Sequence, residues 1–299
     1  SLSHLHVAGG DGDDMVRVNA AGLHAGDVLN GGGGVNSLDL LFEQESALTL
    51  DLPGQGIDVT GFESVSLSGS DSGSGNPFTL ILDNDMAEAE TTLYVNASGL
   101  DAGLVLDGRD ETNAHLFITG GSVDNTIWGG SAGDTIAGGD DGTTLHSTRN
   151  LIYGGSGNDE IWLQDGYNTV HAGGGDDFIS FMSSGDATID GGAGNDTVSG
   201  GEGGSLSITV IGGAGNDIYS IYNNGTVLDY SQGGFTGVTV DLSSTTAYDP
   251  DNTGYPDYLY TAVKHADAIV STDLLHYSIK NIKGSAGDDL FLTRRYDLT

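Results

Sequence analysis

Short apolar segments alternate with glycine- and aspartate-rich segments along the middle of the chain, with a period of nine residues. From Gly120 the repeats read GGSVDNTIW, GGSAGDTIA and GGDDGTTLH, and after a seven-residue insert they resume as GGSGNDEIW at Gly154. Most repeats end in Asp-x-apolar or a close variant, and the alternation of polar and apolar positions is typical of a half-buried strand. The pattern predicts one strand in each repeat, preceded by a tight turn.

The four strongest repeats set the length of one coil. GGSGNDEI (154–161), AGGGDDFI (172–179), GGAGNDTV (191–198) and GGAGNDIY (212–219) start 18, 19 and 21 residues apart. Two repeats then make one coil of a flattened, right-handed parallel β-solenoid, with strands of successive coils about 4.8 Å apart. The fold class is therefore all-β. The apolar positions expected to line the interior are Ile136, Ile161, Val170, Ile179, Val198, Tyr219 and Leu228.

The remainder of the chain also has the pattern of β-structure. VNAAGLHAGDVLNGG (18–32) and VNASGLDAGLVLDGR (95–109) form a longer repeat, and only residues 262–277 carry a weak helical pattern. Outlying nine-residue repeats stand at 9–17, 31–39 and 284–292. We expect three segments: an irregular β-solenoid over 1–118, the regular array over 119–230, and a C-terminal β segment over 231–299.

The net charge of the chain indicates a binding function as well as a fold. Among 299 residues, 43 are Asp or Glu and 8 are Lys or Arg, which gives a formal net charge of -35. Such a charge opposes compaction unless cations bind, while 37% hydrophobic residues argue against disorder. Nucleic acid and anionic membranes need basic patches, so the composition argues against both as direct partners. No apolar run is long enough for membrane insertion as a helix.

The turn of each strong repeat has the donors of a cation site. Glycines at positions 1, 2 and 4 permit positive φ and close carbonyl packing, and stacking places the aspartates of successive coils above one another. An all-oxygen set selects Ca²⁺ over Zn²⁺ or Mg²⁺. The expected carboxylate ligands are Asp14, Asp134, Asp159, Asp177, Asp196, Asp217 and Asp289. The expected carbonyl ligands lie near Gly155, Gly157, Gly173, Gly175, Gly192, Gly194, Gly213 and Gly215.

These repeats resemble the RTX, or haemolysin-type calcium-binding, nonapeptide repeats of secreted Gram-negative proteins, and the close resemblance covers about 120–229. The resemblance implies a parallel β-roll, several Ca²⁺ ions between its turns, and secretion to the cell exterior or surface of a Gram-negative bacterium. The VNA(A/S)GL segments are similar to strand repeats of RTX-type surface-layer proteins. Extracellular calcium modules bind at about 10⁻⁴–10⁻³ M, which suits a chain that folds after export.

The two edges of the expected solenoid differ in their donors. The alternate repeats carry Asn168, Asp186, Ser205 and Thr226 near the ligand position, and they vary in length. We therefore expect Ca²⁺ chiefly along the edge of the strong repeats, and loops or polar side-chain contacts along the other. Because the apolar interior is thin, we expect bound ions to supply a large part of the folding free energy.

A second kind of calcium loop is a candidate within DPDNTGYPDYLY (249–260), although Tyr260 stands where a bidentate Glu is expected. An ordinary turn cluster is the alternative. The residues at ligand positions are Asp249, Asp251, Thr253, Tyr255 and Asp257.

Three functions fit this sequence, and catalysis within the chain is not expected because the common nucleophile and zinc-protease motifs are absent. The first is a calcium-dependent structural segment of a surface layer or adhesin. The second is a non-catalytic C-terminal module of a type I-secreted enzyme, and the third is a glycan- or ice-binding adhesin tip. The expected partners are Ca²⁺, further copies of the chain in a homo-oligomer or lattice, and cell-surface polysaccharide. Since the chain starts at Ser1, we expect it to be a piece of a longer protein.

Overall fold

The computed structural model forms two compact units, Ser1–Thr169 and Val170–Thr299, and the boundary between them lies within strand β16 (Tyr167–Gly174). The residues that it describes are 3–43, 48–70, 76–139, 148–181, 185–200, 207–211, 213–222, 225–232, 237–248, 257–266, 269–276 and 281–293. The segment boundaries at 118 and 230 come from the type of repeat and stay a prediction.

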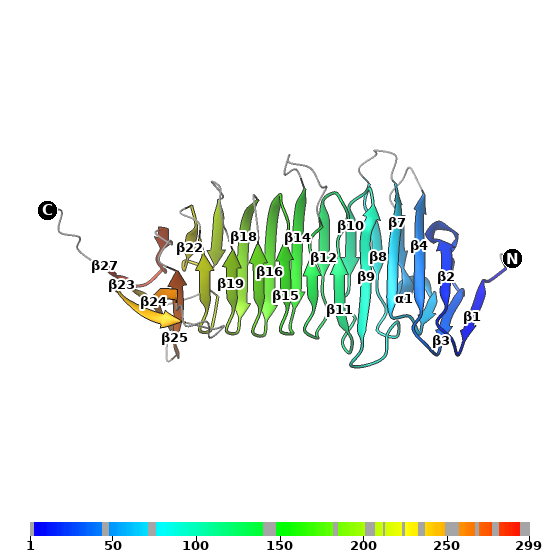
Figure 1. Cartoon of the computed structure of the whole chain (residues 1–299), viewed down its shortest axis with the longest axis horizontal. Helices are drawn as coiled ribbons and strands as arrows, with labels where there is room; N and C mark the ends of the chain where they lie inside the picture. The colour runs from blue at the N-terminus through cyan, green and yellow to red at the C-terminus, as the bar shows by residue number, and fades with distance from the viewer. Residues whose placement is uncertain are drawn as a thin grey trace. The chain divides into compact units, whose positions relative to one another are not determined.

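The N-terminal unit is built of parallel strands that succeed one another along the coil axis (Figure 1). Its first sheet contains β1 (His6–Gly10), β3 (Val28–Gly32) and β6 (Asp58–Thr60). The second contains β2 (Met15–Asn19), β4 (Ser37–Glu43), β7 (Ser64–Ser70), β9 (Thr92–Leu100), β11 (His115–Thr119), β13 (Thr135–Ala137) and β15 (Glu160–Leu163). The third contains β5 (Leu48–Asp51), β8 (Phe78–Ile81), β10 (Leu104–Asp107), β12 (Asn125–Trp128) and β14 (Arg149–Gly155). Helical turns are limited to η1 (Ala20–Gly22) and α1 (Leu52–Gln55) in this unit's described residues.

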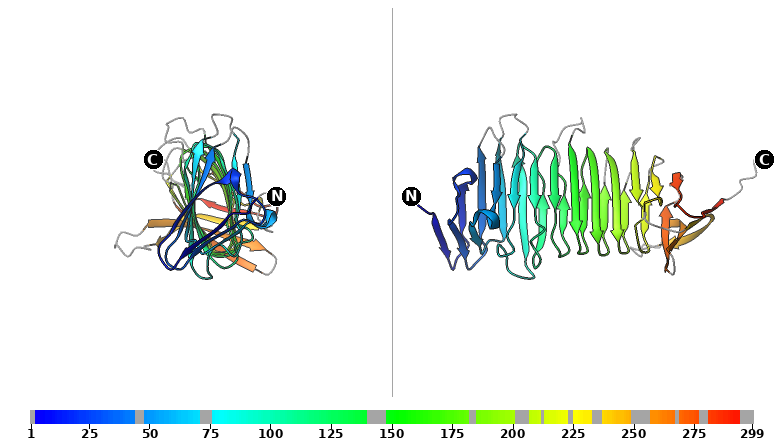
Figure 2. Two further views of the ribbon diagram at one scale, coloured as in Figure 1. Left: turned by 90° about the vertical axis from the view of Figure 1, so that its right-hand side faces the viewer. Right: turned by 180° about the vertical axis from the view of Figure 1, so that it is seen from behind.

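The C-terminal unit begins with the same alternation and ends differently. One parallel sheet contains β17 (Phe178–Phe181), β19 (Thr197–Gly200) and β21 (Ile218–Ile221). The other contains β18 (Asp186–Ala193), β20 (Ile208–Ile211), β22 (Val227–Asp229) and β26 (Asn281–Lys283). The antiparallel strands, drawn in orange in Figure 2, are β23 (Gly237–Tyr248), β24 (Asp257–Ala266) and β25 (Ile269–His276). β25 pairs in parallel with β21, and β27 (Leu290–Thr293) pairs in parallel with β23.

The interior of each unit contains a column of apolar side chains that lie in register in successive coils. Ile136 lies opposite Ile161 in the N-terminal unit, and Val198 lies opposite Tyr219 in the C-terminal unit. Each of the seven positions expected to line the interior is at most 2% exposed. Because successive side chains of a strand point to opposite faces, the alternation in the sequence carries over directly into burial. The all-β parallel solenoid and its interior are confirmed.

The two copies of the longer sequence repeat share one local hydrogen bond but differ in secondary structure. Asn19 accepts a hydrogen bond from the backbone N–H of Ala21 (3.0 Å), and Asn96 accepts one from Ser98 (3.0 Å), but the VNAAGL segment contains η1 and the VNASGL segment lies within β9. The leucine that ends each copy, Leu23 or Leu100, is buried. Side chains that bond the backbone two residues on are typical of asparagine. In both copies the VNA(A/S)GL motif therefore ends with an apolar residue in the interior.

The weak helical pattern at residues 262–277 is not a helix. This stretch contributes to β24 and β25, which pair in antiparallel register from Leu259 opposite His276 to Ala266 opposite Ile269. The helical period was weak, whereas the ladder gives eight consecutive residue pairs to the backbone of both strands. Pairing with a neighbouring strand therefore overrides local periodicity here.

Candidate metal centre

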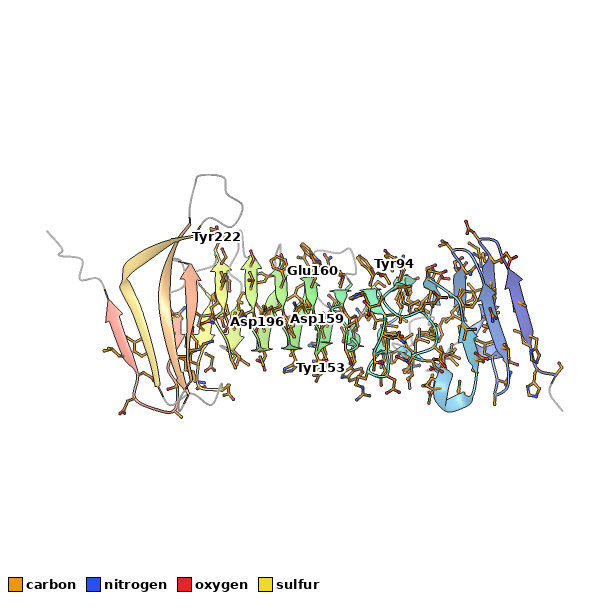
Figure 3. The ribbon with its side chains drawn as sticks, turned by 90° about the horizontal axis from the view of Figure 1, so that it is seen from below. Tyr94, Tyr153, Asp159, Glu160, Asp196 and Tyr222 are labelled. Carbon is orange, nitrogen blue, oxygen red and sulfur yellow. The ribbon has the colours of Figure 1, made fainter. Side chains whose placement is uncertain are left out.

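Five of the expected aspartates hold one structural position. Asp134 and Asp159 directly precede β13 and β15 in the N-terminal unit. Asp177, Asp196 and Asp217 precede β17, β19 and β21 in the C-terminal unit. We call this the aspartate edge of each unit, and all five side chains are 1–2% exposed. Figure 3 shows Asp159 between the layers, with Glu160 and Tyr153 on the two outer faces.

Backbone donors hold the carboxylates of the N-terminal unit in place. Oδ1 of Asp134 accepts the N–H of Leu116 (2.8 Å) and Oδ2 accepts the N–H of Gly130 (2.6 Å). The N–H of Asp134 in turn donates to Oδ1 of Asp159 in the following coil (2.7 Å). Each carboxylate is therefore fixed by the turn above or below it, before any ion is considered.

The C-terminal unit repeats this link twice. The N–H of Asp177 donates to Oδ1 of Asp196 (3.0 Å), and the N–H of Asp196 donates to Oδ1 of Asp217 (3.0 Å). Oδ2 of Asp196 is buried and has no hydrogen-bond partner among the residues that the structure describes. A buried carboxylate oxygen in that state is costly unless a cation compensates it. Asp196 and its neighbours thus fit a Ca²⁺ site, which needs hard oxygen donors.

Glycine is required where the turns stack. Gly194 and Gly215 have φ of +139° and +130°, and a Cβ on either would collide with the carbonyl oxygen of the glycine one coil earlier, Gly175 or Gly194. Of the eight predicted carbonyl donors, seven have positive φ: Gly155, Gly173, Gly175, Gly192, Gly194, Gly213 and Gly215. The eighth, Gly157, lies against the backbone of Ala132, where a side chain would clash. Glycine at these positions therefore allows the backbones of successive turns to stack closely.

Carbonyl donors matter because acidic side chains alone do not complete a site. No group of three or more His, Cys, Asp or Glu side chains suited to a metal comes together in the described part of the chain. A cation on the aspartate edge would take its other ligands from the turns. Among the predicted donors, the carbonyl of Gly192 already accepts the N–H of Ala214 (2.6 Å).

Burial changes the acidity of the edge. It raises the pKa of Asp196 from 3.8 to about 7, and the charges of Asp217 and Asp177 add to the rise. Burial also raises the pKa of Asp134 to about 6, although the N–H groups of Leu116 and Gly130 partly offset it. In the absence of a cation, these side chains hold protons at a pH where an ordinary aspartate is charged.

We expect calcium binding to strengthen between about pH 5 and about pH 8, with protons released as ions bind. The raised pKa values of Asp134 and Asp196 stabilise the ion-free fold at low pH, and that contribution is lost as pH rises through about 6 to 7. Protons and Ca²⁺ compete for the same oxygens. Calorimetry in two buffers of different ionisation enthalpy measures the released protons, and an affinity that does not change with pH would contradict this.

The opposite edge of the N-terminal unit is closed by amides. Nδ2 of Asn125 donates to Oδ1 of Asn150 (2.8 Å), and Nδ2 of Asn150 donates to Oδ1 of Asn168 (2.9 Å). We call this the asparagine edge, and its three side chains are 2–4% exposed. The polar side-chain contacts expected at Asn168 are confirmed. A column of neutral amides satisfies its own donors and acceptors and brings no net charge to a cation.

The other alternate-repeat positions in the C-terminal unit are less regular. Asp186 is half-buried, and its Oδ1 accepts the N–H of Ser207 (2.9 Å). Thr226 is fully buried. Ser205 lies outside the described residues.

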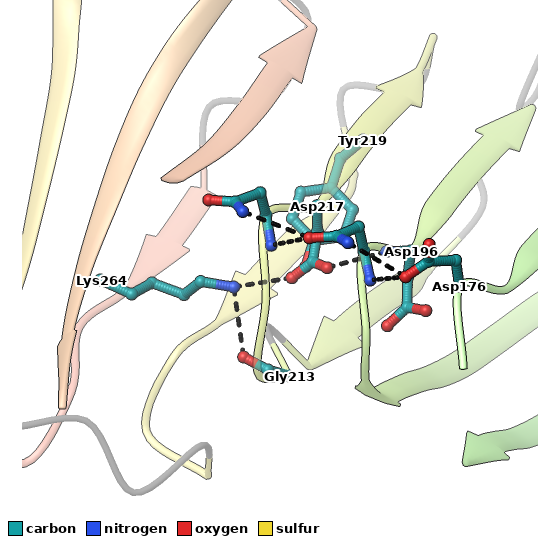
Figure 4. A network of polar contacts seen from close by, with 8 residues as sticks. Asp176, Asp196, Gly213, Asp217, Tyr219 and Lys264 are labelled. Atoms are coloured by element: carbon teal, nitrogen blue, oxygen red, sulfur yellow. Dashed lines mark hydrogen bonds and ion pairs between the residues drawn. The ribbon is translucent and has the colours of Figure 1, made fainter. Parts of the chain in front are cut away.

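A lysine ends the aspartate edge of the C-terminal unit. Nζ of Lys264, in β24, lies 2.6 Å from Oδ2 of Asp217 and donates to the carbonyl of Gly213 at 3.2 Å (Figure 4). Tyr219 also donates to Oδ2 of Asp217 (3.1 Å), and the Lys264 side chain is fully buried. Asp217 and Gly213 were predicted as calcium donors. Here the ammonium group lies against the same two oxygens that a cation would use.

Sequence reasoning missed Lys264 altogether. It stands 47 residues after Asp217, in a strand that carried a weak helical pattern. The only available signal was a single Lys inside an apolar stretch of a chain with 8 basic residues. Because a buried lysine is rarely found without a partner, this Lys indicated an acidic partner, but nothing in the sequence showed which residue it was.

The outlying candidates are less enclosed. Asp14 is half-buried, and its N–H donates to Oδ1 of Asn36 (2.9 Å), which is the same link between coils as on the aspartate edge. Asp289 is half-buried and accepts a hydrogen bond from Oγ of Ser285 (2.7 Å). The candidate loop with Asp249, Asp251, Thr253 and Tyr255 lies outside the described residues, and of Asp257 only its place as the first residue of β24 is described.

Stacked parallel coils, with buried aspartates beneath glycine turns, define a β-solenoid of the calcium-binding repeat class. A family model of the RTX calcium-binding nonapeptide repeat matches the chain in four copies, at residues 117–145, 147–180 and 183–204. The matched residues therefore carry RTX repeats, and they support a calcium-binding structural repeat domain in this part of the solenoid. No curated protein matches the chain. No helix among the described residues is long and apolar enough to span a membrane.

Proposed function

We propose that the chain is a secreted or cell-surface structural segment, of the surface-layer or adhesin kind, that Ca²⁺ folds and stiffens. The observation that carries this proposal is the aspartate edge, and above all the buried Oδ2 of Asp196, which has no protein partner among the described residues. Within the C-terminal unit, Asp177 and Asp196 would hold ions together with carbonyls of the glycine turns. Asp134 and Asp159 would do so in the N-terminal unit. Bound Ca²⁺ supplies positive charge between carboxylates that would otherwise repel one another.

The cellular setting rests on composition and family. RTX repeats typify secreted bacterial proteins, and a formal net charge of -35 favours a site of millimolar calcium over the cytosol. A repeat domain of this kind is a structural fold. A module appended to a secreted enzyme shares the same calcium chemistry and is the main alternative.

Aromatic side chains on the solenoid give limited support for a glycan-binding tip. Trp128 and Tyr153 stack in parallel with ring centroids 5.6 Å apart, and the Arg109 guanidinium lies 5.1 Å from the Trp128 ring. Sugar rings bind to open aromatic faces, whereas the facing sides of these two rings cover each other. This stack therefore supports a role in stiffening the outer face of the coil.

Asp196→Asn is expected to raise the calcium concentration at half-folding by tenfold or more, about 1.4 kcal/mol. Asparagine keeps the acceptor for the Asp177 N–H but removes the charge that a cation needs. Asp186→Asn is the matched control, because it makes the same change on a side chain that also accepts one backbone N–H, from Ser207. Circular dichroism during a calcium titration measures both midpoints. Equal shifts in the two variants would contradict the assignment of Ca²⁺ to the aspartate edge.

A further inference from the structure

A buried glutamate lies on the aspartate edge just before the repeats matched by the family model. Glu111 is fully buried, and its Oε1 accepts the N–H groups of Asn113 and Ala114, each at 3.0 Å. Its Oε2 is buried and makes no hydrogen bond to any residue that the structure describes. No arginine or lysine forms an ion pair with Glu111 within that part of the chain. An isolated carboxylate in such surroundings requires either a proton or a cation.

A second oxygen of the same turn, Oδ1 of Asn113, is also buried and makes no hydrogen bond within the described residues. The hydrogen bond from the Asn113 N–H to Glu111 fixes the two residues relative to each other. One short turn thus holds a carboxylate oxygen and an amide oxygen, both suited to a hard cation.

The turn of the next coil brings a second carboxylate to Glu111. Ser131 donates its N–H to the Glu111 carbonyl (3.1 Å), so the 129–134 turn stacks on the Glu111 turn. Asp134, at the end of that turn, accepts the N–H of Leu116 from the coil of Glu111. These two hydrogen bonds join the turn that carries Glu111 to the turn that carries Asp134. Both therefore contribute negative charge to the same junction between coils.

We propose that Glu111 and Asn113, together with Asp134, form a further Ca²⁺ site, one coil before the recognised repeats. The donors are two carboxylates and an amide oxygen, with backbone carbonyls of the stacked turns to complete the shell. Glu111 stands where the coil has no aspartate before its strand, since Ala114 precedes β11. The carboxylate at this coil is instead that of Glu111, which lies earlier in the turn. This inference rests on the proposed function, because Asp134 is shared with the repeat array.

Glu111→Gln is expected to lower the number of Ca²⁺ ions bound by the full chain by one. Glu160→Gln is the matched control, because it removes the same charge from an exposed side chain of β15. It should leave the number of bound Ca²⁺ ions unchanged. Equilibrium dialysis with radioactive calcium at saturating concentration measures the count. An unchanged count in Glu111→Gln would overturn the proposed site. A wild-type chain that binds no Ca²⁺ would instead overturn the function proposed above.

Asn113→Asp tests the site even if Glu111→Gln does not fold. The change replaces a buried amide oxygen by a carboxylate of the same size, which costs stability without a cation and strengthens binding with one. The gain in melting temperature between about 1 mM and about 20 mM Ca²⁺ is expected to exceed that of the wild type. An equal or smaller gain would contradict a cation at this turn.

Discussion

Removal of calcium by a chelator near neutral pH is expected to expand the chain and to remove most of its β-sheet signal, and millimolar Ca²⁺ is expected to restore both. Apart from Asp217, which pairs with Lys264, four aspartates of the two aspartate edges are 1–2% exposed, and the formal net charge is -35. Without cations, these charges must be protonated or exposed to water, and a thin apolar interior does not offset that cost. Circular dichroism and small-angle scattering, before and after calcium is restored, measure the transition.

Magnesium at the same ionic strength is the control for this experiment. It screens charge as Ca²⁺ does but adapts poorly to irregular sites of many oxygens, so it should restore much less structure. Spectra that are identical with and without chelator would overturn calcium-dependent folding.

Light scattering in the same titration distinguishes a lattice-forming segment from an appended module. Growth into assemblies as Ca²⁺ is added supports a lattice, whereas a folded monomer supports an appended module.

Lys264→Met is expected to destabilise the calcium-bound chain by about 3–5 kcal/mol. The substitution leaves the buried Asp217 carboxylate without the ammonium group that lies 2.6 Å from it. Urea unfolding at fixed Ca²⁺ concentration measures the loss. Because Oδ2 of Asp217 and the carbonyl of Gly213 also suit a metal ion, raising Ca²⁺ should recover part of the stability.

Lys283→Met is the matched control for this change. Lys283 pairs with Asp229 at 2.8 Å, but its side chain is 56% exposed, so its loss should cost less than about 1 kcal/mol. If both variants lose the same stability, Lys264 does not act as a buried counter-charge. If Lys264→Met is destabilised and calcium recovers none of the loss, the ammonium and a metal ion are not interchangeable at Asp217.

Local periodicity made the central coils predictable. The nine-residue pattern places Ile136 inside and Asp134 at the turn, because a strand alternates its faces and a glycine turn precedes it. The same reasoning predicted a calcium-rich edge at Asp196 and a calcium-poor edge at Asn168, and the calcium content of both edges stays a prediction. These features depend only on residues within one repeat and on the length of one coil.

Features that depend on distant segments could not be predicted. The Asn125–Asn150–Asn168 column requires the register of three coils, with steps of 25 and 18 residues, and the sequence between them varies in length. Lys264 reaches Asp217 only because antiparallel strands follow the last regular coil. Glu111 stands outside the repeat pattern, so no spacing rule led to it.

The amide column gives the N-terminal unit a mechanical asymmetry. Hydrogen bonds between Asn125, Asn150 and Asn168 do not depend on any ion, whereas Asp134 and Asp159 on the other edge carry charges that repel unless neutralised. As calcium is withdrawn, we expect the coils of this unit to separate first along the aspartate edge and last along the asparagine edge, before the chain expands. The amide column therefore sets the order in which the two edges come apart.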